Sequence, residues 1–159
     1  MVWLAKGGTM FALAMTAACI RTPQTLVDSL IERMPERDVM QAVGSAGDSF
    51  RVVLDVSLPK DDPRPPHSVK VFTADRVMCA GQLSTMSLSF YQGKLQTVSC
   101  YPKDVDAMID ALLQATVIST RSREFSVTRE GVAISSHVVD GDWCVSFASE
   151  RLSAQQRRW

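Results

Sequence analysis

The sequence lacks the features that mark several classes of protein. It contains no Asn, which removes every N-glycosylation sequon. Its 17 basic residues balance 17 acidic residues, so the formal net charge is zero. Without a positive field the chain has little to attract nucleic acid or an anionic surface. We therefore expect no nucleic-acid partner.

Motifs for metals, phosphate and catalysis are missing as well. The chain has two histidines, His67 and His137, and no C-x-x-C pair, so the usual ligand spacing of a zinc site is absent. It also contains no G-x-S-x-G sequence and no glycine-rich phosphate loop. We predict no metal site, no cofactor and no catalytic residue, and we favour a binding role over an enzymatic one.

One pair of residues keeps an enzymatic alternative open. The turn Asp140–Gly141 predicts a hairpin in which His137 faces Cys144, with Cβ atoms about 5 Å apart. A thiol beside an imidazole can act as a nucleophile. No third residue that would orient the base is visible in the pattern. The alternative function is a small thiol or hydrolytic enzyme that uses these two residues.

The first 18 residues contain the three parts of a bacterial export signal in the correct order. Lys6 and the amino terminus supply positive charge, an apolar run begins at Met10, and Ala17 and Ala18 are small residues at its end. At about 1.5 Å per residue, this run is too short to span a hydrocarbon core about 30 Å thick. Extended back through residues 2–5 it is long enough, so an uncleaved anchor is an alternative.

The segment "MTAAC", residues 15–19, resembles the lipobox of bacterial lipoproteins. The resemblance covers residues 1–19 and implies a signal peptide at 1–18, acylation of Cys19 by palmitate or a similar chain, and a short tether over 19–22. Thr16 departs from the pattern, because the family usually has Leu at that place. Ile20, in place of the Asp that retains such proteins in the inner membrane, implies an outer-membrane anchor facing the periplasm.

The lipobox implies two partners, the membrane through the lipid and another envelope protein. The sequence thus predicts a lipoprotein of the cell envelope that acts as a binding, accessory or inhibitory module. A third possibility is a soluble cytoplasmic partner protein in which residues 1–20 belong to the core.

Three cysteines follow the segment that the lipobox covers. An exported body would carry Cys79, Cys100 and Cys144 into an oxidising compartment, where one disulfide and one remaining thiol are expected. Three pairings are possible, and the spacing does not choose between them.

Helical periodicity occurs in four places. Thr22 and Pro23 predict a helix start, and Pro35 either breaks that helix or opens a second, short one that Gly44 would end. Apolar residues over 105–113 predict another helix, with Asp104 and Asp106 near its start, where the helix dipole favours negative charge. Ser149 is the predicted cap of a short terminal helix.

Alternating apolar residues predict strands elsewhere. The clearest is 50–58, with one apolar face, and it is followed by the exposed proline-rich loop 59–67. Strands over 69–74, 124–128, 132–139 and 142–148 accompany a hairpin around Gln92–Gly93, in which Leu88 faces Thr97. We predict one α+β domain over 23–159, a mostly antiparallel β-sheet with two or three amphipathic helices packed on one face.

Overall fold

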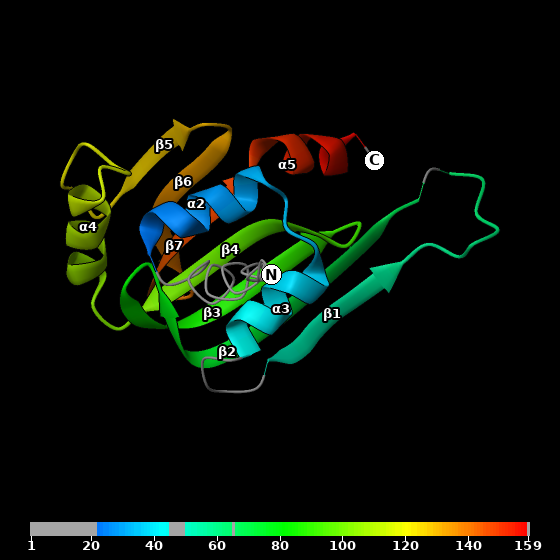
Figure 1. Ribbon diagram of the computed structural model, residues 1–159, viewed down its shortest axis with the longest axis horizontal. Helices are drawn as coiled ribbons and strands as arrows, with labels where there is room; N and C mark the ends of the chain where they lie inside the picture. Colours follow the sequence, from blue (N-terminus) through cyan, green and yellow to red (C-terminus); the bar gives the residue numbers. More distant parts are fainter. Residues whose placement is uncertain (1–21, 45–49, 65, 159) are drawn as a thin grey trace, which may run out of the picture.

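A computed structural model describes residues 22–44, 50–64 and 66–158. In these ranges, four helices accompany one seven-stranded antiparallel sheet of order β1-β2-β3-β4-β7-β6-β5 (Figure 1). The predicted α+β class with a mostly antiparallel sheet is confirmed. The strands are β1 (Arg51–Ser57), β2 (Ser68–Cys79), β3 (Gln82–Tyr91), β4 (Lys94–Pro102), β5 (Phe125–Arg129), β6 (Val132–Val139) and β7 (Asp142–Ser149), and the helices are α2 (Pro23–Ile31), α3 (Glu36–Gly44), α4 (Val105–Gln114) and α5 (Glu150–Arg157).

Two-residue turns close four of the hairpins. They are Ala80–Gly81, Gln92–Gly93, Glu130–Gly131 and Asp140–Gly141, and all eight residues have positive φ. Two consecutive residues of positive φ form the turn whose twist matches that of the flanking strands. The predicted turns Gln92–Gly93 and Asp140–Gly141 are confirmed. The hairpin of β1 and β2 differs, because its strands are joined by the long segment 58–67.

The register of β6 and β7 is the predicted one. Ile134 lies opposite Phe147, and His137 lies opposite Cys144. The register of β3 and β4 differs from the prediction.

A bulge explains this difference. Leu88 pairs with Val98, and Thr97 pairs with Ser89, so the predicted facing of Leu88 and Thr97 is wrong. Gln96 is the unpaired residue of the bulge, and one extra residue shifts all later pairs of the strand.

The predicted helix starts are confirmed by their caps. Thr22 and Thr25 form a reciprocal capping box at the start of α2, where Pro23 occupies the first turn. The side chain of Asp104 accepts from Ala107 N at 3.0 Å at the start of α4, and Ser149 caps α5. Each cap satisfies backbone donors that a helix start leaves without a partner.

The two faces of the sheet differ in composition. One face contributes a row of apolar residues, each paired with the next across neighbouring strands: Phe72, Leu88, Val98, Phe147 and Ile134. All five are buried, and they share one hydrophobic core with buried residues of three helices, among them Leu26 and Leu30 of α2, Val39 of α3, and Met108 and Leu112 of α4.

The opposite face carries hydroxyl groups. Thr73, Ser87, Ser99, Ser146, Ser135 and Ser126 are successive partners across six strands, and we name them the hydroxyl row. Ala133 and Ala148, two residues away from this row, line a cavity together with Glu150 and Ala154 of α5. The last helix therefore contacts one end of the hydroxyl face.

Candidate functional site

Strand β1 forms one edge of the sheet, and all seven of its residues are exposed. Four of them are large aliphatic residues: Val52 is 52% exposed, Val53 58%, Leu54 44% and Val56 49%. The single apolar face that alternation predicted is wrong, because the register slips between Val52 and Leu54. Val52 pairs with Phe72 and Leu54 pairs with Val71, so these two side chains lie on opposite faces, and the described part of the chain leaves both exposed. Within that part no other strand pairs with the outer edge of β1 (Figure 1).

The exposed aliphatic surface continues into the next strand. Leu54 lies opposite Val71, and Val56 lies opposite Val69, and both of these β2 residues are half-buried. We name the six aliphatic residues of the two strands the β1 patch: Val52, Val53, Leu54, Val56, Val69 and Val71. The register slips between Val52 and Leu54, so Val53 is the extra residue of a bulge. Such a patch on an edge strand is typical of a surface that another chain covers.

Charged side chains flank the β1 patch. Arg51 Nη2 lies 3.4 Å from Asp75 Oδ2, in an ion pair whose two side chains are both more than half exposed. Lys70, which lies opposite Asp55, places its Nζ 2.9 Å from Glu36 Oε1 of α3. The hydrogen bond from Lys70 to Glu36 raises the pKa of that ammonium group above its ordinary value, so it stays charged at neutral pH.

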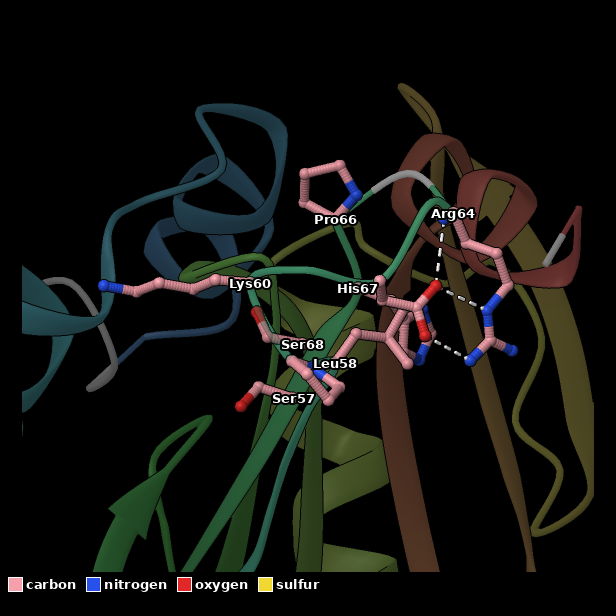
Figure 2. Close-up of a pocket in the computed structure, with 9 residues that line it drawn as sticks. Ser57, Leu58, Lys60, Arg64, Pro66, His67 and Ser68 are labelled. Carbon is pink, nitrogen blue, oxygen red and sulfur yellow. Dashed lines mark hydrogen bonds and ion pairs between the residues drawn. The ribbon is translucent and has the colours of Figure 1, made fainter.

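The loop that joins β1 to β2 is held by its own ion pair. Arg64 binds Asp62 in a bidentate manner, with Nη2–Oδ2 at 2.7 Å and Nε–Oδ1 at 2.9 Å (Figure 2). The backbone N–H of Arg64 also donates to Asp62 Oδ1 at 2.9 Å. These hydrogen bonds lower the pKa of Asp62 from 3.8 to about 2, because they favour the charged carboxylate.

Contacts with the turn between β3 and β4 fix the base of the same loop. Gln92 Nε2 donates to the carbonyl of Pro66 at 2.5 Å, and the Gln92 backbone N–H donates to the carbonyl of Ser68 at 2.9 Å. The ring of His67 packs edge-on against Tyr91, with centroids 5.4 Å apart. These contacts hold the base of the loop against the turn between β3 and β4. The tip of the hairpin projects beyond the sheet (Figure 1).

A cavity of about 350 Å³ lies at this tip, lined by residues that include Ser57, Leu58, Lys60 and His67. Arg64 is neutralised by Asp62, and Lys60 is directed away from the other labelled side chains (Figure 2). The described residues therefore gather no converging set of charges for an ionic ligand. We therefore do not assign this cavity as a binding site for an ionic ligand.

The structure joins Cys79 to Cys100 in a disulfide, with Cα atoms 6.2 Å apart, and leaves Cys144 as a free thiol. Both bonded residues are fully buried and link β2 to β4. A Cα separation of this size is ordinary for a disulfide. Sequence spacing left this pairing open.

The residues of the enzymatic alternative are cross-strand neighbours that differ in exposure. His137 is exposed, whereas Cys144 is 1% exposed, with its Sγ 3.3 Å from Ser146 Oγ. Within the ranges described, no hydrogen bond joins His137 to Cys144. Cys144 instead contacts Tyr101, whose pKa is raised by burial and by a hydrogen bond with this thiol.

The described residues contain neither a cluster of metal ligands nor a helix that could span a membrane. Over residues 22–44, 50–64 and 66–158, no group of three or more His, Cys, Asp or Glu side chains is placed to hold a metal ion. Over the same ranges, no helix has the length and apolarity needed to cross a membrane. The predicted signal peptide at 1–18 and the predicted lipid site Cys19 lie outside the described residues.

Comparison with known proteins gave no match: no protein-family model, no curated protein and no solved structure matches the chain.

Sequence analysis did not single out the β1 patch as a binding surface. One signal was available, because Val52 and Val53 are consecutive and interrupt strict alternation, which places aliphatic side chains on both sides of the strand. A second signal was the proline-rich segment after β1, since a long loop in place of a tight turn is common at functional surfaces.

Proposed function

We propose that this protein is a lipoprotein of the bacterial cell envelope whose folded domain binds another protein through β1. The exposure of the β1 patch on an open sheet edge carries this proposal. Proteins usually protect such edges with short strands, charges or covering elements. An added strand would satisfy the outer backbone groups of β1 and would cover its aliphatic side chains at the same time.

The proposed anchor rests on the sequence "MTAAC" and on its distance along the chain from helix α2. Helix α2 begins at Pro23, its cap is Thr22, and Cys19 is three residues earlier. A lipid on Cys19 would hold the domain close to the bilayer without a long flexible stalk. The proposed location is the outer membrane, with the domain facing the periplasm.

We also propose that α2, α3 and α4 are the amphipathic helices that cover one face of the sheet. Their buried residues share the core with the apolar row of β2, β3, β4, β6 and β7. Helix α5 is set apart from them, because it lines a cavity with Ala133 and Ala148 of the hydroxyl face.

Intact-mass analysis of the full-length chain expressed in a bacterium tests the anchor. We expect loss of residues 1–18, a mass gain from two or three acyl chains, and recovery of the protein in the membrane fraction. A Cys19→Ser variant should lack the acyl mass and leave that fraction. A full-length, unmodified mass in the soluble fraction would contradict the anchor and support the cytoplasmic alternative, in which residues 1–20 belong to the core.

Photo-crosslinking in living cells tests the binding surface. A photoreactive amino acid in place of Leu54 should give a protein adduct, because the side chain lies in the β1 patch. The same amino acid in place of Ser126 is the matched control, since Ser126 is an exposed residue of β5, the other edge strand. Equal adducts at both positions, or none at position 54, would show that β1 is not the binding surface.

A further inference from the structure

One end of the hydroxyl face carries an aromatic side chain. Tyr101 lies opposite Thr85 across β4 and β3, two residues along each strand from the Ser99–Ser87 pair of the hydroxyl row. Side chains two residues apart in a strand share a face, so Tyr101 and Thr85 belong to the hydroxyl face. Helix α5 contacts Ala148, which lies on the other side of the hydroxyl row, so the helix and Tyr101 occupy opposite ends of this face.

Two cavities adjoin each other at Tyr101. Their volumes are about 310 Å³ and about 170 Å³, and both are lined by Tyr101 and Thr85. The larger is also lined by Val139, Asp140 and Asp142, and the smaller by Asp75, Arg76 and Lys103 among others. Because they share two lining residues, the cavities form one groove across this end of the hydroxyl face, which we name the Tyr101 groove.

The Tyr101 side chain is held in place within the groove. Its hydroxyl group hydrogen-bonds with the thiol of Cys144, and the Cys144 Sγ lies 3.3 Å from Ser146 Oγ. Cys144 is buried, whereas Tyr101 is half-buried. Since the hydroxyl group is engaged at Cys144, the ring is the part of Tyr101 that a ligand in the groove would contact.

The charges around the groove are balanced. Asp75 contacts two groups, because its Oδ1 lies 3.1 Å from Thr85 Oγ1 and its Oδ2 lies 3.4 Å from Arg51 Nη2. The charged side chains at the groove, with this partner of Asp75 included, are Asp75, Asp140, Asp142, Arg51, Arg76 and Lys103. Positive and negative groups are equal in number, so the groove has no net charge that would attract an ionic ligand.

This combination of groups fits a ligand that is rich in hydroxyl groups. Carboxylates accept hydrogen bonds, guanidinium and ammonium groups donate them, and a hydroxyl group does both. A sugar ring carries hydroxyl groups around its rim and C–H groups on its faces. The face of an aromatic ring is negative, so it attracts the slightly positive C–H groups of such a sugar face.

We propose that the Tyr101 groove binds a neutral oligosaccharide, with the Tyr101 ring against the face of one sugar unit and the surrounding charged side chains bonded to its hydroxyl groups. The proposal goes beyond the proposed function and depends neither on β1 nor on the lipid anchor. The larger cavity has a volume at the lower end of the range for small-molecule sites, so we expect a dissociation constant of about 1 mM.

NMR titration of the full-length chain tests this proposal with three neutral probes: cellotriose, maltotriose and triacetylchitotriose. At least one probe should shift the backbone amide signals of Thr85, Tyr101 and Asp142 in a saturable manner. Trigalacturonate, an acidic trisaccharide, is the ligand control. It should bind more weakly than the best neutral probe, because the groove has no net positive charge to offset the desolvation of its carboxylates.

Substitutions of Tyr101 separate the role of the ring from that of the hydroxyl group. Tyr101→Leu removes the aromatic face and should weaken binding by about tenfold. Tyr101→Phe keeps the ring and is the matched variant, which should bind within about twofold of the wild type. Asp142→Asn, at an exposed position, should weaken binding by about threefold without altering the ring. Ser126→Ala on β5 lies outside the groove and should leave binding unchanged.

Three results would overturn the proposal. They are the absence of saturable shifts with all three neutral probes at about 10 mM, affinity for trigalacturonate equal to or above that for the best neutral probe, and wild-type affinity in both Tyr101→Leu and Asp142→Asn. If Tyr101→Leu does not fold, Asp142→Asn alone decides. The adduct at position 54 is measured at a different surface, so failure of the groove and failure of the proposed function are distinguishable.

Discussion

The two edge strands of the sheet, β1 and β5, each pair with one antiparallel strand, but the surroundings of their side chains differ. In β5, Phe125 and Val127 pack against the core, and the side chain of Arg129 donates to the carbonyl of Thr116. Thr128 Oγ1 of the same strand bonds Glu150 Oε1 of α5 at 3.0 Å. In β1 all seven residues are exposed.

This comparison shows that position at an edge does not by itself make a binding surface. The β5 edge is short and fastened by contacts within the chain, and it leaves little for another chain to cover. The β1 edge is longer and carries the largest group of exposed aliphatic side chains among the described residues.

The largest expected effect on stability comes from the disulfide, which joins β2 to β4 and so lies between the two edge strands. The double substitution Cys79→Ala and Cys100→Ala opens a cross-link over 21 residues of sequence. Removing it should lower the free energy of unfolding by about 3 kcal/mol, as measured by urea denaturation. Mock-reduced wild type is the control, and a change below about 1 kcal/mol would show that the cross-link contributes little.

The second effect compares the two edges directly. Phe125→Ala in β5 removes a half-buried ring that packs against the core and should lower the free energy of unfolding by about 2 kcal/mol. Val53→Ala in β1 should change it by less than about 0.5 kcal/mol in the monomer, because the side chain is 58% exposed. Equal losses in denaturant titrations would contradict the difference between the edges.

The third effect concerns how each edge strand is connected. Gly131, with a φ of +80°, closes the tight turn between β5 and β6, and Gly131→Ala should cost about 1 kcal/mol of stability because the positive φ strains any side chain. The connection of β1 has no such requirement, so Pro63→Ala should stay within about 0.5 kcal/mol. Thermal unfolding followed by circular dichroism measures both variants. A larger loss of stability for Pro63→Ala than for Gly131→Ala would contradict the prediction.

The smallest effect is a local pH response at the hairpin tip. The pKa of Asp62 in the folded chain is about 2, below its ordinary 3.8, so the carboxylate stabilises the folded tip above about pH 4. That contribution is lost as the pH falls toward 2, when the folded carboxyl takes up its proton. Arg64→Ala should return the pKa of Asp62 toward 3.8, as followed by NMR titration of its carboxyl carbon, and an unchanged titration would exclude Arg64 as the cause.

Local patterns in the sequence predicted most elements and several contacts. The Thr22 and Pro23 start of α2, the helix that begins after Asp104 and the two glycine turns at 93 and 141 each depend on neighbouring residues only, although the role of Asp104 as the cap of α4 was not predicted. For that reason the pairing of His137 with Cys144 could be counted outward from the turn.

Features that depend on distant parts of the chain were harder to predict. Alternation in β1 predicted the wrong residues for one face, because the sequence does not reveal the bulge at Val53, and alternation does not tell whether anything covers a face, which depends on the order of strands in the sheet. The bulge at Gln96, which shifts the register, was not predicted because no local residue type indicates an extra residue there. Cys79 pairs with Cys100 because β2 and β4 lie on either side of β3 in the sheet, and the spacing of the cysteines along the sequence does not reveal that order.

The hydroxyl row limits which surfaces of the sheet can associate with another protein. A seven-stranded plate with aliphatic side chains on both sides would need a second helical layer, or it would adhere to any similar plate. Ser87, Ser99 and Ser146 near its middle are half-buried polar residues instead, and Ser99 and Ser146 also bond each other at 3.1 Å. The polar side of the sheet thus disfavours non-specific stacking, which leaves the edge at β1 as the place where association with another protein can be selective.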